Sequence, residues 1–186
     1  MPATRHAQLR NVTGDGEHRR SVDAFIAQAE STPSEHWELP LAPGKWSPAQ
    51  VAEHLRLTYD VVCRELAGGE GLRPRASWWL RPILRLRYLP MILRGRRLPE
   101  GARAPREIRP GPGPFPREAL LAALREGAGR AEEAMAARAP GDPGFTHHVF
   151  GHLTAGKALR FAAVHNEHHT RQLAGTPPPA TADPSP

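Results

Sequence analysis

The chain has 186 residues, of which 39% are hydrophobic, and this is enough for one domain around a single core. Its single cysteine, Cys63, excludes an internal disulfide framework, and the lack of a long apolar run or a secretory signal predicts a cytoplasmic protein without a transmembrane helix. The formal net charge is +6, but residues 72–97 contain eight arginines and no acidic residue, so the remainder of the chain has a net charge of −2. Because the positive charge is confined to this one segment, it does not favour a nucleic-acid partner.

The N-terminal half carries the signals of two amphipathic helices. Residues 1–14 have the composition of a flexible arm, and we expect the folded domain over residues 15–174. Apolar residues then recur at helical spacing up to Pro33: Val22, Phe25, Ile26 and Ala29. The stretch Ser47-Pro48-Ala49-Gln50 predicts the start of a second helix, because it combines a serine cap, proline in the first turn and glutamine three residues later. This helix should end near Ala67, before two glycines.

The second helix places a histidine close to its apolar face. His54 lies about 60° from the centre of that face, so we expect it inside the domain or at its mouth. Cys63 is nine residues further on and therefore on the opposite side of the helix, where it is predicted to pack and not to bind metal.

Residues 68–115 are predicted to form an irregular, basic crossover, with one or two short helices broken at Pro82 and Pro90. Its arginine-rich part, residues 72–97, has three interpretations. We favour a solvated crossover whose tryptophans pack on the domain and whose arginines point to water. The alternatives are an element that touches a membrane surface through Trp78 and Trp79, or a site for nucleic acid or another anion.

The C-terminal half predicts two further helices. One begins near Pro116 and ends before Pro140, and the other extends from about Thr154 to Leu173. Residues 175–186 have the composition of a disordered, proline-rich tail. The four helices together predict an all-α domain.

The last helix carries the candidate metal ligands. His165 and His169 are about 40° apart on its inward face, and a histidine pair at this spacing forms a bidentate clamp. His54, on the facing helix, would complete a three-histidine site. Two alternatives stay open: His168 replaces His169 as ligand, or the histidines are hydrogen-bonded core residues. Three buried imidazoles without a metal would leave polar groups that cost about 1–3 kcal/mol each if unpaired, which favours ligation.

Two segments of the sequence carry a family resemblance. These are GKWSPAQVAEHL (44–55), with Trp-Ser before a helical histidine, and HHVFGHLTAGKALRFAAVHNEHHTRQL (147–173), with its late H-x3-H pair. In both, the chain resembles the DinB-like superfamily of YfiT-type metal-binding four-helix bundles over about residues 18–174. It departs from the related pattern at His148, where proline is usual, and in its basic crossover.

The resemblance implies a four-helix bundle with up-down-down-up connectivity, in which residues 68–115 supply the long crossover between the second and third helices. It implies the same ligands, His54, His165 and His169, and a supporting role for Gln172. The bound ion would be one divalent metal: zinc, nickel, iron(II) or manganese.

Other members of the superfamily are thiol-dependent transferases and isomerases, so the resemblance implies a metal-dependent enzyme that acts on a small-molecule substrate. It would be a transferase that uses a low-molecular-weight thiol, or a hydrolase. The alternative is a non-enzymatic, metal-stabilised bundle that binds a protein or a membrane surface through residues 72–97, and a homodimer stays open. A cavity above the metal lined by His148, His152 or arginines would favour the enzyme. With ordinary histidine pKa values near 6.5, metal retention is predicted to fall between about pH 6.5 and 5.

Overall fold

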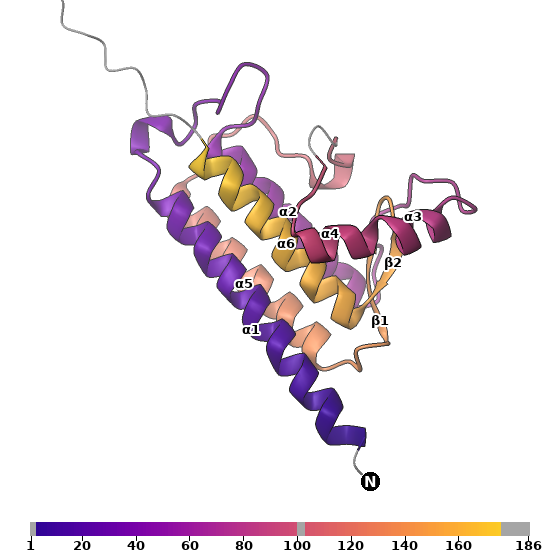
Figure 1. The fold of residues 1–186 in the computed structure, drawn as a ribbon. Coiled ribbons are helices and arrows are strands. Elements are labelled where there is room, and N and C mark those ends of the chain that lie inside the picture. Colours follow the sequence, from indigo (N-terminus) through magenta and orange to yellow (C-terminus); the bar gives the residue numbers. More distant parts are fainter. Residues whose placement is uncertain (1–2, 100–102, 176–186) are drawn as a thin grey trace, which may run out of the picture.

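A computed structural model describes residues 3–99 and 103–175, with side chains from residue 16 onward. Most of the described chain is helical, and its long helices lie side by side (Figure 1). They are α1 (Ala3–Glu30), α2 (Pro48–Leu66), α5 (Arg117–Ala136) and α6 (Ala155–Ala174). The closest pairs are α1 with α6 and α2 with α5, and α1 also packs on α5. Among the described residues, no helix combines the length and the apolar character that a bilayer crossing requires.

The N-terminal end of the domain differs from the sequence-based expectation. The flexible arm predicted over residues 1–14 is helical from Ala3, because α1 extends back beyond the domain (Figure 1). Extending an existing helix fixes one residue for each hydrogen bond gained, whereas starting a new helix is costly, and no proline interrupts residues 3–30. In the predicted tail, Gly175 caps α6, and residues 176–186 lie outside the described residues.

The start of α2 is confirmed in detail. The backbone N–H of Gln50 donates to the Ser47 hydroxyl over 3.1 Å, and the Gln50 side chain accepts from the Ser47 backbone N–H, also over 3.1 Å. This reciprocal capping box, with Pro48 in the first turn, fixes where the helix begins. Because the start is fixed, the face on which His54 lies is fixed as well.

The crossover between α2 and α5 contains two short helices, α3 (Arg81–Arg87) and α4 (Leu89–Gly95). Pro82 and Pro90 lie in the first turns of these helices and do not break them, because a first-turn N–H has no intrahelical partner to lose. A single 3₁₀ turn, η2 (Arg106–Ile108), follows before α5, and another, η1 (Ser34–His36), lies between α1 and α2.

The predicted burial of the crossover tryptophans is wrong. Trp78 and Trp79 are 78% and 60% exposed, while Leu89, Ile92 and Leu93 occupy the side of the crossover that faces the core. The segment is apolar on more than one side, so those leucines and Ile92 fill the available space and the tryptophans remain outside.

A small antiparallel hairpin corrects the all-α expectation. Its strands are β1 (Pro143–His147) and β2 (Gly151–Thr154), and Thr146 pairs with His152. The hairpin forms because its apolar side chains, Phe145, Phe150 and Leu153, are all buried in the main core. Gly151 has φ = +70°, a conformation that glycine adopts without strain at the turn.

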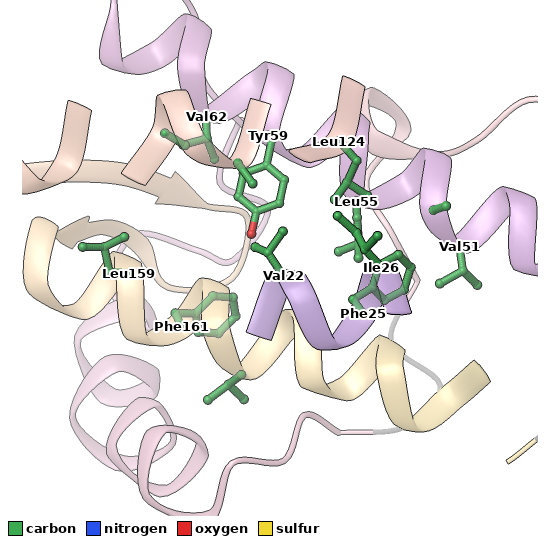
Figure 2. Packing of buried hydrophobic residues seen from close by; sticks show 14 of the residues in the cluster. Val22, Phe25, Ile26, Val51, Leu55, Tyr59, Val62, Leu124, Leu159 and Phe161 are labelled. Carbon is green, nitrogen blue, oxygen red and sulfur yellow. The ribbon is translucent and has the colours of Figure 1, made fainter. Parts of the chain in front are cut away.

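The core lies between the four long helices and is built from their apolar stripes (Figure 2). Side chains of α1 and α2 contribute Phe25, Ile26 and Leu55, each at most 1% exposed, and α5 contributes Leu124. Burying one such side chain stabilises the fold by about 1.5–3 kcal/mol, so this cluster is the main source of stability.

A buried polar network crosses the same core. His18 of α1 is fully buried, and its Nδ1 lies 2.8 Å from the Glu132 carboxylate of α5. Its Nε2 lies 2.8 Å from the hydroxyl of Tyr59 in α2, and that hydroxyl accepts from the Asn166 amide of α6 over 2.8 Å. Burial opposes ionisation of Glu132, but His18 and Arg19 outweigh it and lower the pKa of this carboxyl. The network therefore joins all four long helices one residue away from His165.

Candidate metal centre

The three histidines that the sequence selects lie together in the structure. His54 comes from the middle of α2, and His165 and His169 come from successive turns of α6. The Nε2 atom of His165 is 3.3 Å from Nε2 of His54 and 3.0 Å from Nε2 of His169. All three candidate ligand atoms lie within 4.8 Å of one another. His54 and His169 are buried, at 4% and 6% exposed.

Hydrogen bonds on the far side of two rings set their tautomers. Nδ1 of His54 donates to the backbone carbonyl of Ile108 over 2.7 Å, and Nδ1 of His169 donates to the side-chain oxygen of Gln172 over 2.8 Å. Both acceptors are oxygens without a proton to give, so each Nδ1 must carry the hydrogen. The Nε2 lone pairs of His54 and His169 are therefore directed at His165, as in protein metal sites whose ligands are held by an outer hydrogen bond.

The environment keeps the rings neutral, which is the protonation state that a metal ligand needs. Burial lowers the pKa of His54 to about 4, although its hydrogen bond to Ile108 opposes the change. Burial, and then the proximity of the other imidazoles, also hold the pKa values of His165 and His169 well below 6.5. The ordinary pKa values assumed from the sequence are thus incorrect for this site.

The spacing of the three nitrogens fits a divalent ion. Ligand nitrogens about 2.1 Å from a common ion would be roughly 3.0–3.4 Å apart in facial octahedral or tetrahedral arrangements. The two measured separations, 3.0 and 3.3 Å, fall in this range. His168 does not belong to the group of three, and its ring centroid lies 5.1 Å from that of His169. The geometry thus favours His169 over His168 as the third candidate ligand.

A cavity of about 250 Å³ opens beside the three histidines. Its walls are mainly apolar, with contributions from α2, α6, the hairpin and the crossover, including Val62, Leu72, Leu98, Phe150 and Phe161. His147, His148 and His168 also line it, as does Arg103. His152, a candidate for this position from the sequence, lies outside the cavity, where its side chain is 76% exposed and its Nδ1 is 2.8 Å from the Thr146 hydroxyl.

Two polar groups in the cavity differ in their availability. Glu65 is occupied, because it accepts hydrogen bonds from the backbone and the hydroxyl of Thr146. The Nδ1 atom of His148 is buried and has no hydrogen-bond partner within the described residues. Burial, followed by the positive charge of Arg75, lowers the pKa of His148, so its imidazole is neutral near pH 7. A neutral imidazole has one nitrogen with a lone pair, so His148 can accept a hydrogen bond from a bound molecule.

Sequence reasoning missed the backbone carbonyl in the crossover that orients the His54 ring. The Ile108 carbonyl belongs to η2, and any residue at that position has a carbonyl, so the sequence carries no signal for it. Gln172, which the resemblance places beside the site, contacts His169. Cys63 packs against the core of the domain, as expected, and its thiol contacts the Gly127 carbonyl over 3.4 Å.

A family model described as the DinB superfamily matches residues 17–173, which include the three histidines, Ile108, Gln172 and His148. No match was found among curated proteins or among solved structures.

Proposed function

The chain belongs to the DinB superfamily, and on this basis we propose that it is a metal-dependent enzyme acting on a small, largely apolar molecule. One divalent ion, zinc, nickel, iron(II) or manganese, would be held by His54, His165 and His169. The reaction would be transfer to a low-molecular-weight thiol, or hydrolysis. The observation that carries the proposal is the convergence of three neutral Nε2 atoms at the wall of a cavity large enough for a small molecule.

The proposal extends to the connectivity of the helices, up-down-down-up. It is supported by the pairing of α1 with α6 and of α2 with α5, and by Figure 1, in which the two helices of each pair run in the same direction. Because α2 and α5 are parallel neighbours that follow one another in the chain, they require a long connection, and the crossover between them provides it. That crossover also supplies Ile108 and part of the cavity wall, so it contributes directly to the site.

The bound ion would act as a Lewis acid that makes a thiol or a water molecule more acidic. The residues of the chain would perform the remaining tasks. His148 would accept the proton of the thiol or water as its sulfur or oxygen attacks an electrophilic carbon and the leaving group departs with the bonding electrons, because His148 lines the cavity and its Nδ1 has no hydrogen-bond partner within the described residues. The apolar walls would orient the substrate and exclude water, which strengthens polar interactions inside the cavity.

The test measures thiol consumption by the metal-loaded protein with a panel of low-molecular-weight thiols and electrophiles, alongside hydrolysis of activated esters. Ala162→Phe should fill part of the cavity and abolish turnover while the metal is retained, because Ala162 lines the cavity beside His165. Ala122→Phe on the exposed side of α5 is the matched control. His148→Ala should lower turnover about 100-fold or more without loss of metal. If the wild-type protein is no faster than His165→Ala with any member of the panel, the proposed activity is wrong.

A further inference from the structure

The crossover presents an exposed apolar surface. We call it the α3–α4 face and define it by Trp78, Trp79, Ile83, Leu86, Tyr88 and Met91, which are between 47% and 78% exposed. Within the described residues, the other exposed large hydrophobic residue is Leu39. Scattered exposed hydrophobic residues are normal in a protein, whereas six of them within residues 78–91 indicate a site of interaction.

The face belongs to a well-anchored element. Backbone hydrogen bonds from Tyr88 to Leu84 and from Ile92 to Tyr88 connect α3 and α4 into a nearly continuous helix across the long helices (Figure 1). The opposite side of this element is buried through Leu89, Ile92 and Leu93. The core side of this element is thus already filled while the tryptophans are exposed, so docking would not require the crossover to unfold.

The segment that carries the face has only positive charges of its own. Residues 72–97 contain eight arginines and no acidic residue. Arg96 is bound by Glu17 and Glu167, and Arg85 donates to the His152 carbonyl. Arg87, Arg94 and Arg97 are exposed and make no ion pair with any described residue. Exposed tryptophans among unpaired arginines match the boundary of an anionic bilayer, where indole rings lie at the level of the headgroups and guanidinium groups bind phosphates.

We propose that the α3–α4 face docks on an anionic lipid surface, with Trp78, Trp79 and Leu86 entering the headgroup boundary and Arg87, Arg94 and Arg97 contacting lipid phosphates. A second copy of the chain fits less well. In a two-fold interface the same patch meets itself, which would bring unpaired arginines against arginines. This proposal is independent of the metal centre, because none of these six residues is a candidate ligand or lines the cavity.

The test is co-sedimentation of the full chain with vesicles of equimolar phosphatidylglycerol and phosphatidylcholine, compared with phosphatidylcholine alone, in about 0.15 M salt. The wild-type protein should sediment only with the anionic vesicles. Arg87→Glu with Arg94→Glu should weaken binding at least about 25-fold, since each basic side chain near such a surface contributes about a fivefold gain in affinity. Arg125→Glu with Arg160→Glu, two exposed arginines elsewhere, makes the same change in net charge and should keep most of the binding.

A second pair of variants separates insertion from charge attraction. Trp78→Ser with Trp79→Ser should abolish sedimentation at about 0.15 M salt, while Leu39→Ser should not. All variants alter exposed side chains, so unchanged melting temperatures should confirm that they fold. Absence of anionic-vesicle binding by the wild-type protein would overturn the proposal. A dimer in sedimentation velocity that only the α3–α4 substitutions dissociate, without vesicle binding, would assign the face to a second copy instead.

Discussion

Acidification of the metal-free protein should destabilise it, because the fold holds the three site histidines in the neutral form. In the unfolded chain a histidine binds a proton below a pKa of about 6.5, whereas in the folded protein burial lowers the pKa of His54 to about 4. Between these values the unfolded state binds more protons, so stability falls as the pH falls through this window. His165 and His169 act in the same direction, because their pKa values are also held well below 6.5.

The size of the effect follows from the pKa difference. At about pH 5, His54 alone lowers the free energy of unfolding by about 2 kcal/mol. His165 and His169 add to this loss in the same direction, so the total exceeds the contribution of His54, which is already a large fraction of the stability of a small domain. The metal-free protein should therefore be markedly less stable near pH 5 than near pH 7.5.

The assay is urea unfolding of chelator-treated protein, followed by circular dichroism, at several values between about pH 7.5 and 5. His54→Leu should reduce the stability lost by about pH 5 by about 2 kcal/mol, whereas His152→Gln, which alters an exposed histidine, should leave the loss unchanged. Equal stability at both ends of this range would refute the reasoning, because it would mean that the three rings are not buried as neutral groups.

Three further predictions concern other parts of the molecule. At about pH 7.5 the metal-loaded protein should melt above the chelator-treated protein, and equal melting temperatures would show that the metal is not coupled to folding. Glu132→Leu should cost about 3 kcal/mol in urea unfolding, because it leaves buried His18 without its partner, while Glu126→Leu at an exposed position should cost little. Ser47→Ala should cost about 1 kcal/mol through loss of the capping box, and a change below a few tenths of a kcal/mol would contradict that role.

The sequence was informative wherever the signal was local. Ser47 and Gln50 fixed the start of α2, and helical spacing placed His54, His165 and His169 on inward faces. The DinB superfamily was recognisable because the tryptophan-serine and H-x3-H motifs are themselves short and local.

Features that depend on tertiary packing were not predictable. The hairpin strands have five and four residues, too few for a reliable alternation of polar and apolar side chains. The crossover is apolar on several sides, so periodicity could not decide whether Trp78 or Leu89 would face the core. The pKa values of the histidines depend on burial, and the tautomer of His54 depends on a backbone carbonyl 54 residues away.

The central claim is that His54, His165 and His169 hold one divalent ion, and the metal content of purified variants tests it most directly. The wild-type chain should contain one ion, while replacement of any of the three by alanine should remove it, because two imidazoles do not retain a metal through purification as three do. His168→Ala, which alters the adjacent cavity histidine, should keep most of the metal. Full metal occupancy in His54→Ala would contradict the account.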